Sequence, residues 1–195
     1  AEKNALESIK LKKSSIEVHH SALSSLAKLL NLQHEINRVE VYDNSHTFGK
    51  NSVGVMIVAN KEGLSPKHYR KFNINYNLED KKVSHVNDYY MMEEVLTRRL
   101  SKIDHKENTS KPDVIIIDGG RGQYNTVIKI LKKYKLNNIE LLSVSKGPDR
   151  NAGREIVHLS NKNITLRPND PLLNLIQRLR DEAHRFAITN HRSRR

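Results

Sequence analysis

Cysteine is absent from the 195-residue sequence. The chain can therefore form no disulfide bond, no zinc site built on thiolates and no cysteine nucleophile. No apolar run approaches the ~20 residues that a membrane-spanning helix needs. No signal peptide is visible, and the sequence begins at Ala1 rather than at an initiator methionine. We therefore expect part of a longer, cytoplasmic protein.

Acidic residues are few relative to basic ones. The chain has 34 Lys and Arg against 22 Asp and Glu, which gives a formal net charge of +12. A surplus of this size predicts a polyanionic partner, and the lack of an apolar span favours nucleic acid over a membrane. The alternative is a composition in which lysine and asparagine are simply abundant. The length allows roughly one domain with its own core.

Residues 114–120 join an apolar run to a carboxylate and two glycines. The run Val-Ile-Ile-Ile indicates a strand buried on both faces, as in the centre of a parallel sheet. Asp118 then lies at the edge of the core, where an ionised carboxylate is costly unless it is paired. Ligands of α/β proteins bind at this end of the strands, and Gly119 and Gly120 permit close approach. The alternative is a local turn in which Asp118 caps backbone N–H groups.

Hydrophobic periodicity predicts the other elements. Helices are expected over residues 4–31, from 87 or 88 to 100, over 122–134 and over 171–188. Strands are expected over 39–43, 53–58, 68–74, 139–144, 156–159 and 164–166, with a loop over 75–86. The first three strands form an antiparallel meander, whereas the unit from 114 to 144 requires parallel pairing. This order predicts an α/β fold, a ribonuclease H-like mixed β-sheet flanked by helices. Residues 1–36 form a helical leader, and residues 37–195 form the domain.

In such a sheet the first and fourth strands are parallel neighbours, so Asp43 and Asp118 end at the same edge. Two carboxylates this close raise each other's pKa unless a divalent cation lies between them. Oxygen ligands of this kind favour Mg²⁺ or Mn²⁺. The sequence therefore predicts a metal site at this edge.

The last helix carries a histidine beside its apolar stripe. On a helix that begins after Asp170, His184 falls on a polar margin, with Gln177, Arg180 and Asp181 as neighbours. From there its side chain can reach a cleft. The alternative is a boundary histidine that only covers apolar surface.

Basic residues cluster in a loop and at the end of the chain. Lys146, Arg150 and Arg154 follow a predicted strand and would face the two aspartates, where we expect them to contact phosphate. Arg180 on the last helix and Arg192 in the basic tail are further predicted DNA contacts. Any loop or tail of so basic a chain carries such residues by chance, so solvated surface is the alternative.

Five motifs, in order along the chain, resemble the C-terminal endonuclease domain of UvrC, the incision subunit of bacterial nucleotide excision repair. They occupy residues 42–47, 87–92, 117–123, 146–150 and 180–188, and the segment at 4–6 is similar to the helix that precedes this domain. The resemblance implies a metal-dependent nuclease that cuts damaged double-stranded DNA 5′ of a lesion once UvrA and UvrB have located it. It is expected to work with UvrB and to be monomeric.

The resemblance also implies roles for individual residues. Asp43 and Asp118 correspond to metal-site aspartates, and His184 to the histidine that completes the triad, as a ligand or as an acid–base group. Asp88 corresponds to an aspartate needed for 5′ incision, although a helix N-cap explains it equally. Asn44 departs from the family, which usually has an apolar residue there. The family's 3′-incising module, UvrB-binding segment and helix-hairpin-helix pair have no counterpart here, so we expect weak DNA binding and no 3′ incision.

Two rival functions are weighed against this one. A non-catalytic DNA-binding module is disfavoured by the acidic pair, because carboxylates facing phosphate weaken binding unless a metal intervenes. An RNA-directed or endonuclease V-like specificity is disfavoured only by the motifs. A nucleotide-binding loop is disfavoured as well, because residues 118–123 lack the Gly-Lys-Ser/Thr ending that holds nucleotide and Mg²⁺.

Overall fold

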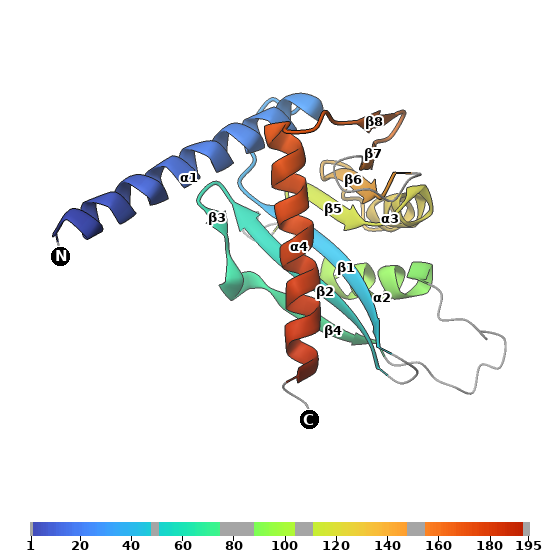
Figure 1. Cartoon of the computed structure of the whole chain (residues 1–195). Helices are drawn as coiled ribbons and strands as arrows, with labels where there is room; N and C mark the ends of the chain where they lie inside the picture. The colour runs from blue at the N-terminus through green and yellow to red at the C-terminus, as the bar shows by residue number, and fades with distance from the viewer. Residues whose placement is uncertain (1, 48–50, 75–87, 104–110, 148–154, 193–195) are drawn as a thin grey trace.

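The computed structural model describes residues 2–47, 51–74, 88–103, 111–147 and 155–192. Within them one sheet carries helices on both faces, and α1 extends away from the body (Figure 1). In chain order the elements are α1 (Glu2–Leu29), β1 (Val39–Thr47), β2 (Asn51–Asn60), β3 (Gly63–Leu64), a 3₁₀ turn (Pro66–His68), β4 (Arg70–Ile74), α2 (Asp88–Leu100), β5 (Val114–Asp118), α3 (Arg121–Lys133), β6 (Glu140–Ser145), β7 (Ile156–His158), β8 (Asn163–Thr165) and α4 (Pro171–Arg192).

The sheet is mixed, as the sequence predicts. Its strand order is β3-β2-β1-β5-β6-β7-β8, and β4 also pairs with β2. β1, β5 and β6 are mutually parallel, whereas β2, β4, β7 and β8 pair antiparallel with their neighbours. The predicted pairing of the first strand with the strand at 114 is confirmed. The third predicted strand is β4, and the two-residue β3 before it was missed because so short a strand has no periodicity.

The apolar run of β5 is buried on both faces. Val114 and Ile116 belong to a core with α1 and α4, while Ile115 and Ile117 belong to a second core with α2 and α3. All four side chains are fully buried. A strand covered on both sides needs apolar residues at every position, which is why the sequence shows a continuous run instead of alternation.

Helix α4 begins as the Asp-Pro pair predicts. The Leu172 backbone N–H donates to Asp170 Oδ1 at 2.8 Å, so Asp170 caps the helix ahead of Pro171. The helix runs to Arg192, beyond the predicted end at 188. The end of α1 packs against the same core through Leu23 and Leu26, so the division at residue 36 stays a prediction. None of the described helices is long and apolar enough to cross a membrane.

A buried charge lies at the other end of β1. The Glu40 side chain is fully buried and accepts from Arg38 Nε at 2.9 Å, from Arg99 Nη2 at 2.6 Å and from Tyr42 Oη at 2.6 Å. Burial, together with the Glu40 charge, raises the pKa of Tyr42 well above its ordinary value. Arg99 comes from α2, so this network joins α2 to the central strand. A buried carboxylate with three donors is stable only while those donors remain.

We therefore expect Arg99→Ala to lower the free energy of unfolding by about 2–3 kcal/mol, because the Glu40 charge then keeps only part of its compensation. Urea denaturation of the 195-residue chain measures this loss. Arg185→Ala is the matched control, since Arg185 pairs with Glu182 on the surface and is 60% exposed. Equal losses in the two variants would contradict a structural role for the buried network.

Candidate active site

The register of β1 and β5 brings the two predicted aspartates together. Tyr42 pairs with Ile117 in the parallel ladder, and Asp43 and Asp118 are the next residues of the two strands. Asp43 is only 7% exposed, while Asp118 is partly exposed at the end of β5. Successive side chains of a strand point to opposite faces, so the two aspartates share a face. That face carries α4.

Asp43 is a carboxylate in an unfavourable environment. Its Oδ2 is buried and has no hydrogen-bond partner among the described residues, although His184 Nδ1 lies 3.4 Å away. Burial raises the pKa of Asp43, and the Asp118 charge raises it further, whereas nearby His184 and Arg180 oppose the shift. A buried, unpaired carboxylate oxygen costs stability and marks a position where an external cation would be favourable.

Asp118 has a cationic partner from α4. Arg180 donates to its Oδ1 through Nε at 3.1 Å and through Nη2 at 2.7 Å. Behind the guanidinium, Glu155 Oε1 lies 3.9 Å from Arg180 Nη1 and accepts from Gln177 Nε2 at 2.8 Å. Gln177, Arg180 and His184 are spaced at i, i+3 and i+7, so one face of α4 supplies all three groups.

The turn between β5 and α3 depends on close backbone packing. Gly119 N–H donates to the Val144 carbonyl at 2.9 Å, and Gly120 N–H donates to Gln123 Oε1 at 3.0 Å. A Cβ on Gly122 would lie 2.3 Å from the hydroxyl oxygen of Tyr89 in α2. A larger residue at 122, in the first turn of α3, would therefore displace the exposed Tyr89 side chain of α2. The alternative role of Asp118 as a cap of local N–H groups is not observed in its described hydrogen bonds, which go to Arg180.

Asp88 and Lys146 lie on other elements around this edge. Asp88 is the exposed first residue of α2, and its carbonyl accepts from Asn44 Nδ2 at 3.4 Å. Asn44, the departure from the family pattern, thus contacts the start of α2 from the position after Asp43. Lys146 is exposed directly after β6. The structure tests neither role, so both stay predictions.

Three of the predicted DNA contacts have side chains that the structure does not describe. Arg150 and Arg154 lie outside the described residues, and Arg192 ends α4 with a side chain that is not described. Arg180 is different: its guanidinium lies on Asp118, and its side chain is 12% exposed. A contact between Arg180 and DNA stays a prediction. Sequence reasoning missed the Arg180–Asp118 pair and did not single out Glu155, because the three residues come from distant segments.

A second polar network lies at the end of β6, directly before Lys146. His158 Nε2 lies 2.8 Å from Ser145 Oγ, and His158 Nδ1 lies 2.9 Å from Asn163 Oδ1. Arg121, in the motif after β5, also donates to Asn163 and to the Leu159 carbonyl. These contacts tie the end of β6 to the hairpin of β7 and β8. They fix where Lys146 leaves the sheet.

The donor set fits a divalent cation in type. Asp43 and Asp118 offer carboxylate oxygens, and His184 offers an imidazole nitrogen. The Asp43 Oδ2 atom is buried, has no hydrogen bond among the described residues and lies near His184 Nδ1. Among the described residues no group of three His, Asp or Glu side chains is gathered closely enough to surround an ion as it stands. His184 is 65% exposed and Asp118 Oδ1 is already paired with Arg180.

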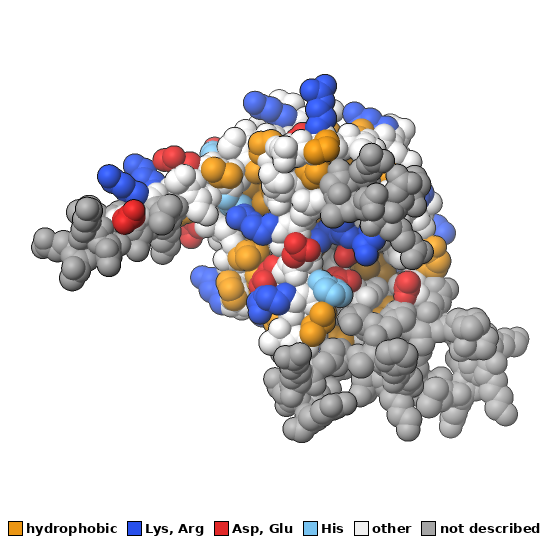
Figure 2. Space-filling model, in the orientation of Figure 1, with side chains coloured by type: hydrophobic (Ala, Val, Ile, Leu, Met, Phe, Trp, Pro, Cys, Tyr) orange, Lys and Arg blue, Asp and Glu red, His pale blue; other side chains and the backbone are white. Residues whose placement is uncertain are grey.

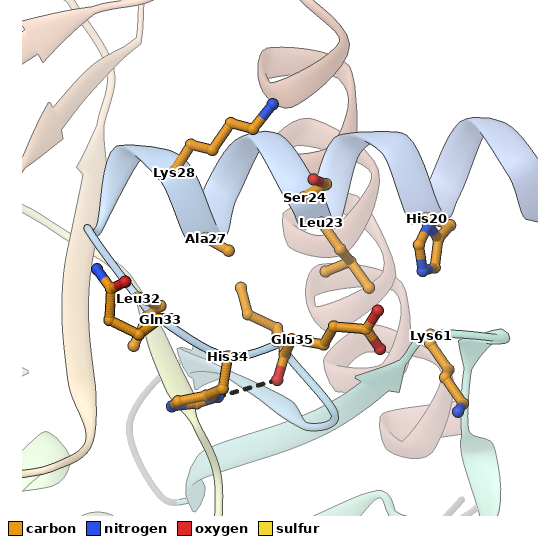
Figure 3. Close-up of a pocket in the computed structure, with 11 residues that line it drawn as sticks. His20, Leu23, Ser24, Ala27, Lys28, Leu32, Gln33, His34, Glu35 and Lys61 are labelled. Carbon is orange, nitrogen blue, oxygen red and sulfur yellow. Dashed lines mark hydrogen bonds between the residues drawn. The ribbon is translucent and has the colours of Figure 1, made fainter.

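Two cavities of the described residues lie away from the candidate site. Acidic, basic and histidine side chains gather over the middle of α4 on the face shown in Figure 2. A cavity of ≈ 260 Å³ lies between α1 and residues 32–36, and its lining includes His20, His34 and Lys61 (Figure 3). Another, of ≈ 600 Å³, includes Arg38 and His68. Asp43, Asp118 and His184 line neither of these cavities.

We expect Asp43→Asn to stabilise the ion-free chain at pH 7. Because burial raises the pKa of Asp43, the ionised form is penalised in the folded state, and this penalty is complete at neutral pH. As the pH falls through the raised pKa, the folded chain takes up a proton first and the penalty disappears. The variant should therefore melt about 2–4 °C higher at pH 7, with little gain in acid. Calorimetry in a chelating buffer tests this, and a gain that grows in acid would contradict it.

Solved structures align with this chain only at low similarity. The catalytic domain of human endonuclease V aligns with 72% of this chain and 59% of its own, at 13% identity and a TM-score of 0.43. The A. aeolicus Argonaute aligns with 69% of this chain and 21% of its own, at 16% identity and a TM-score of 0.34. These likenesses are too distant to bear on function.

Sequence relatives are much closer. UvrABC system protein C of Zymomonas mobilis subsp. mobilis is 44% identical over 200 residues, which cover 100% of this chain and 30% of the relative. The protein of the same name from Bradyrhizobium diazoefficiens is 45% identical over 203 residues, 98% of this chain and 29% of the relative. This chain thus spans about 30% of the length of the curated relatives it matches. A model of the UvrC RNase H endonuclease domain matches residues 27–188, and the chain belongs to that family.

Proposed function

We propose that this chain is a metal-dependent DNA endonuclease domain that makes the 5′ incision in bacterial nucleotide excision repair. The observation that carries the proposal is the buried Oδ2 of Asp43, which has no hydrogen bond among the described residues, beside a second carboxylate at the ends of parallel strands. Such an arrangement destabilises the fold unless it serves a cation. Membership of an endonuclease domain family supports the reaction class.

Asp43 and Asp118 would hold Mg²⁺ or Mn²⁺ at the end of the sheet. A divalent cation bound there supplies charge neutralisation at the phosphoryl oxygens and activation of water. His184 would join the ligands or move a proton at the attacking or leaving oxygen, and its exposure and its position beside Asp43 support this role. Asp88, at the start of α2, would act from the neighbouring element.

Contacts with DNA would come from the cations around this edge. Lys146 is exposed beside the site, and we assign phosphate contacts to it and to Arg150, Arg154 and Arg192. Contacts to phosphate position a duplex without reading its sequence, and they weaken as salt rises. Sequence indifference suits repair. The partners would be damaged double-stranded DNA and UvrB, with this domain monomeric and in the cytoplasm.

Loss of one carboxylate tests the proposal most directly. In the longer protein that contains this chain, assayed with UvrA, UvrB and a damaged duplex, Asp118→Asn should lower the rate of 5′ incision by on the order of 100-fold or more. The 3′ cut, expected from a different module, is the internal control and should remain. Normal 5′ cutting by the variant at saturating Mg²⁺ would overturn the proposed site.

His184→Ala tests the histidine separately. The side chain is 65% exposed, so the variant should fold normally, while 5′ incision slows roughly 100-fold through loss of a ligand or acid–base group. The exposed Thr189 offers a matched control through Thr189→Ala on the same helix. A variant that loses its near-ultraviolet circular dichroism together with activity would instead assign His184 to the support of the fold.

A further inference from the structure

Arg180 is held at the site from two directions. Two of its N–H groups, on Nε and Nη2, point at the same Asp118 oxygen, Oδ1. On the other side Nη1 is 3.9 Å from Glu155 Oε1, and Glu155 is itself 7% exposed and bonded to Gln177. The side chain of Arg180 is 12% exposed. The guanidinium is therefore an ordered positive charge inside the acidic cluster and not a solvated surface group.

This contact occupies one of the two oxygens of a proposed metal ligand. A carboxylate oxygen has two lone pairs, and two N–H donors on Asp118 Oδ1 engage both. A divalent cation on the same carboxylate would also be repelled by the guanidinium, because like charges a few ångströms apart in a partly buried site interact strongly. Arg180 and the cation are in this way alternatives at Asp118.

A phosphate can release the guanidinium. Arginine binds phosphate and carboxylate with the same planar fork of donors, so a backbone phosphate at this edge is a second partner for Arg180. Its long side chain lies on α4 next to the exposed His184, one helical turn away. Transfer of Arg180 from Asp118 to phosphate would free Oδ1 for the ion.

We infer that Arg180 is an exchangeable cation that couples metal binding to DNA binding: it pairs with Asp118 when DNA is absent and moves to a backbone phosphate when DNA and the ion bind together. The inference rests on the proposed function and deepens it. It predicts weak binding of the ion to the DNA-free chain and tighter binding when phosphate is present. By linkage the ion strengthens DNA binding by the same factor.

Mn²⁺ titration of the 195-residue chain by calorimetry tests the inference. Arg180→Gln removes the competing charge, so Mn²⁺ should bind the DNA-free variant on the order of tenfold more tightly than the unchanged chain. Arg180→Lys retains the charge and should show a much smaller gain. Arg185→Gln, which removes an equal charge from the same helix, is the matched control and should change nothing. Arg180→Met, which is uncharged and apolar, repeats the test if the glutamine variant unfolds.

The outcomes separate this inference from the proposed function. Unchanged or weaker Mn²⁺ binding by Arg180→Gln would overturn the exchange and leave Arg180 as a residue that only positions Asp118. Mn²⁺ binding that survives Asp118→Asn, or no binding to any variant with or without DNA, would instead overturn the proposed metal site. A second readout is the fluorescence anisotropy of a labelled 12-base-pair duplex, which measures DNA binding. Mn²⁺ should increase the DNA affinity of Arg180→Gln less than it increases that of the unchanged chain.

Discussion

Repulsion between the carboxylates of Asp43 and Asp118 is the constraint on which the site depends. The parallel register of β1 and β5 forces them to the same edge, and burial prevents water from screening Asp43. Burial and the nearby Asp118 charge both make ionisation of Asp43 less favourable. The folded chain offsets this with cationic or polar groups from a single helix, α4, whose His184 and Arg180 face one aspartate each. The position of α4 is thus as important to the site as the sheet itself.

The same helix is anchored by its apolar side. Leu175, Ile176 and Leu179 are buried in the core that α4 shares with β1 and β5. Movement of the polar face is restricted because the apolar face cannot rotate without exposing these residues. Side chains, and not the helix, must therefore supply any rearrangement at the site. Arg180 and His184 have the length or the exposure to do so, whereas Asp43 does not.

Much of the fold follows from the sequence because its signals are local. The run at 114–117 identifies a strand covered on both faces, and the Asp170-Pro171 pair identifies the start of α4. Once the antiparallel meander of the first three strands and the parallel unit from 114 to 144 are recognised, only a few strand orders are compatible with both. β3 escaped prediction because two residues carry no pattern, and the extension of α4 to Arg192 has no terminating signal that the sequence reveals. Local chemistry thus predicts elements better than their ends.

The site was predicted less completely, for a physical reason. Strand order brings Asp43 and Asp118 together, but nothing local shows that Arg180, 62 residues beyond Asp118, reaches back to it. The prediction that Arg180 contacts DNA rested on its positive charge alone, which any arginine of a basic chain shares. Glu155 had no sequence signal except its place before a short strand.

A chain with formal charge +12 attracts phosphate over much of its surface, yet the two catalytic candidates are acidic. A DNA phosphate that reaches this edge would therefore be repelled by the carboxylates of Asp43 and Asp118. A cation between them removes the conflict, and Arg180 already neutralises part of it on the protein side. Because a guanidinium can serve either anion, its choice of partner depends on what else is bound. If Arg180 exchanges partners as inferred, DNA binding and metal binding at this edge depend on each other, which would restrict cutting to a correctly seated strand.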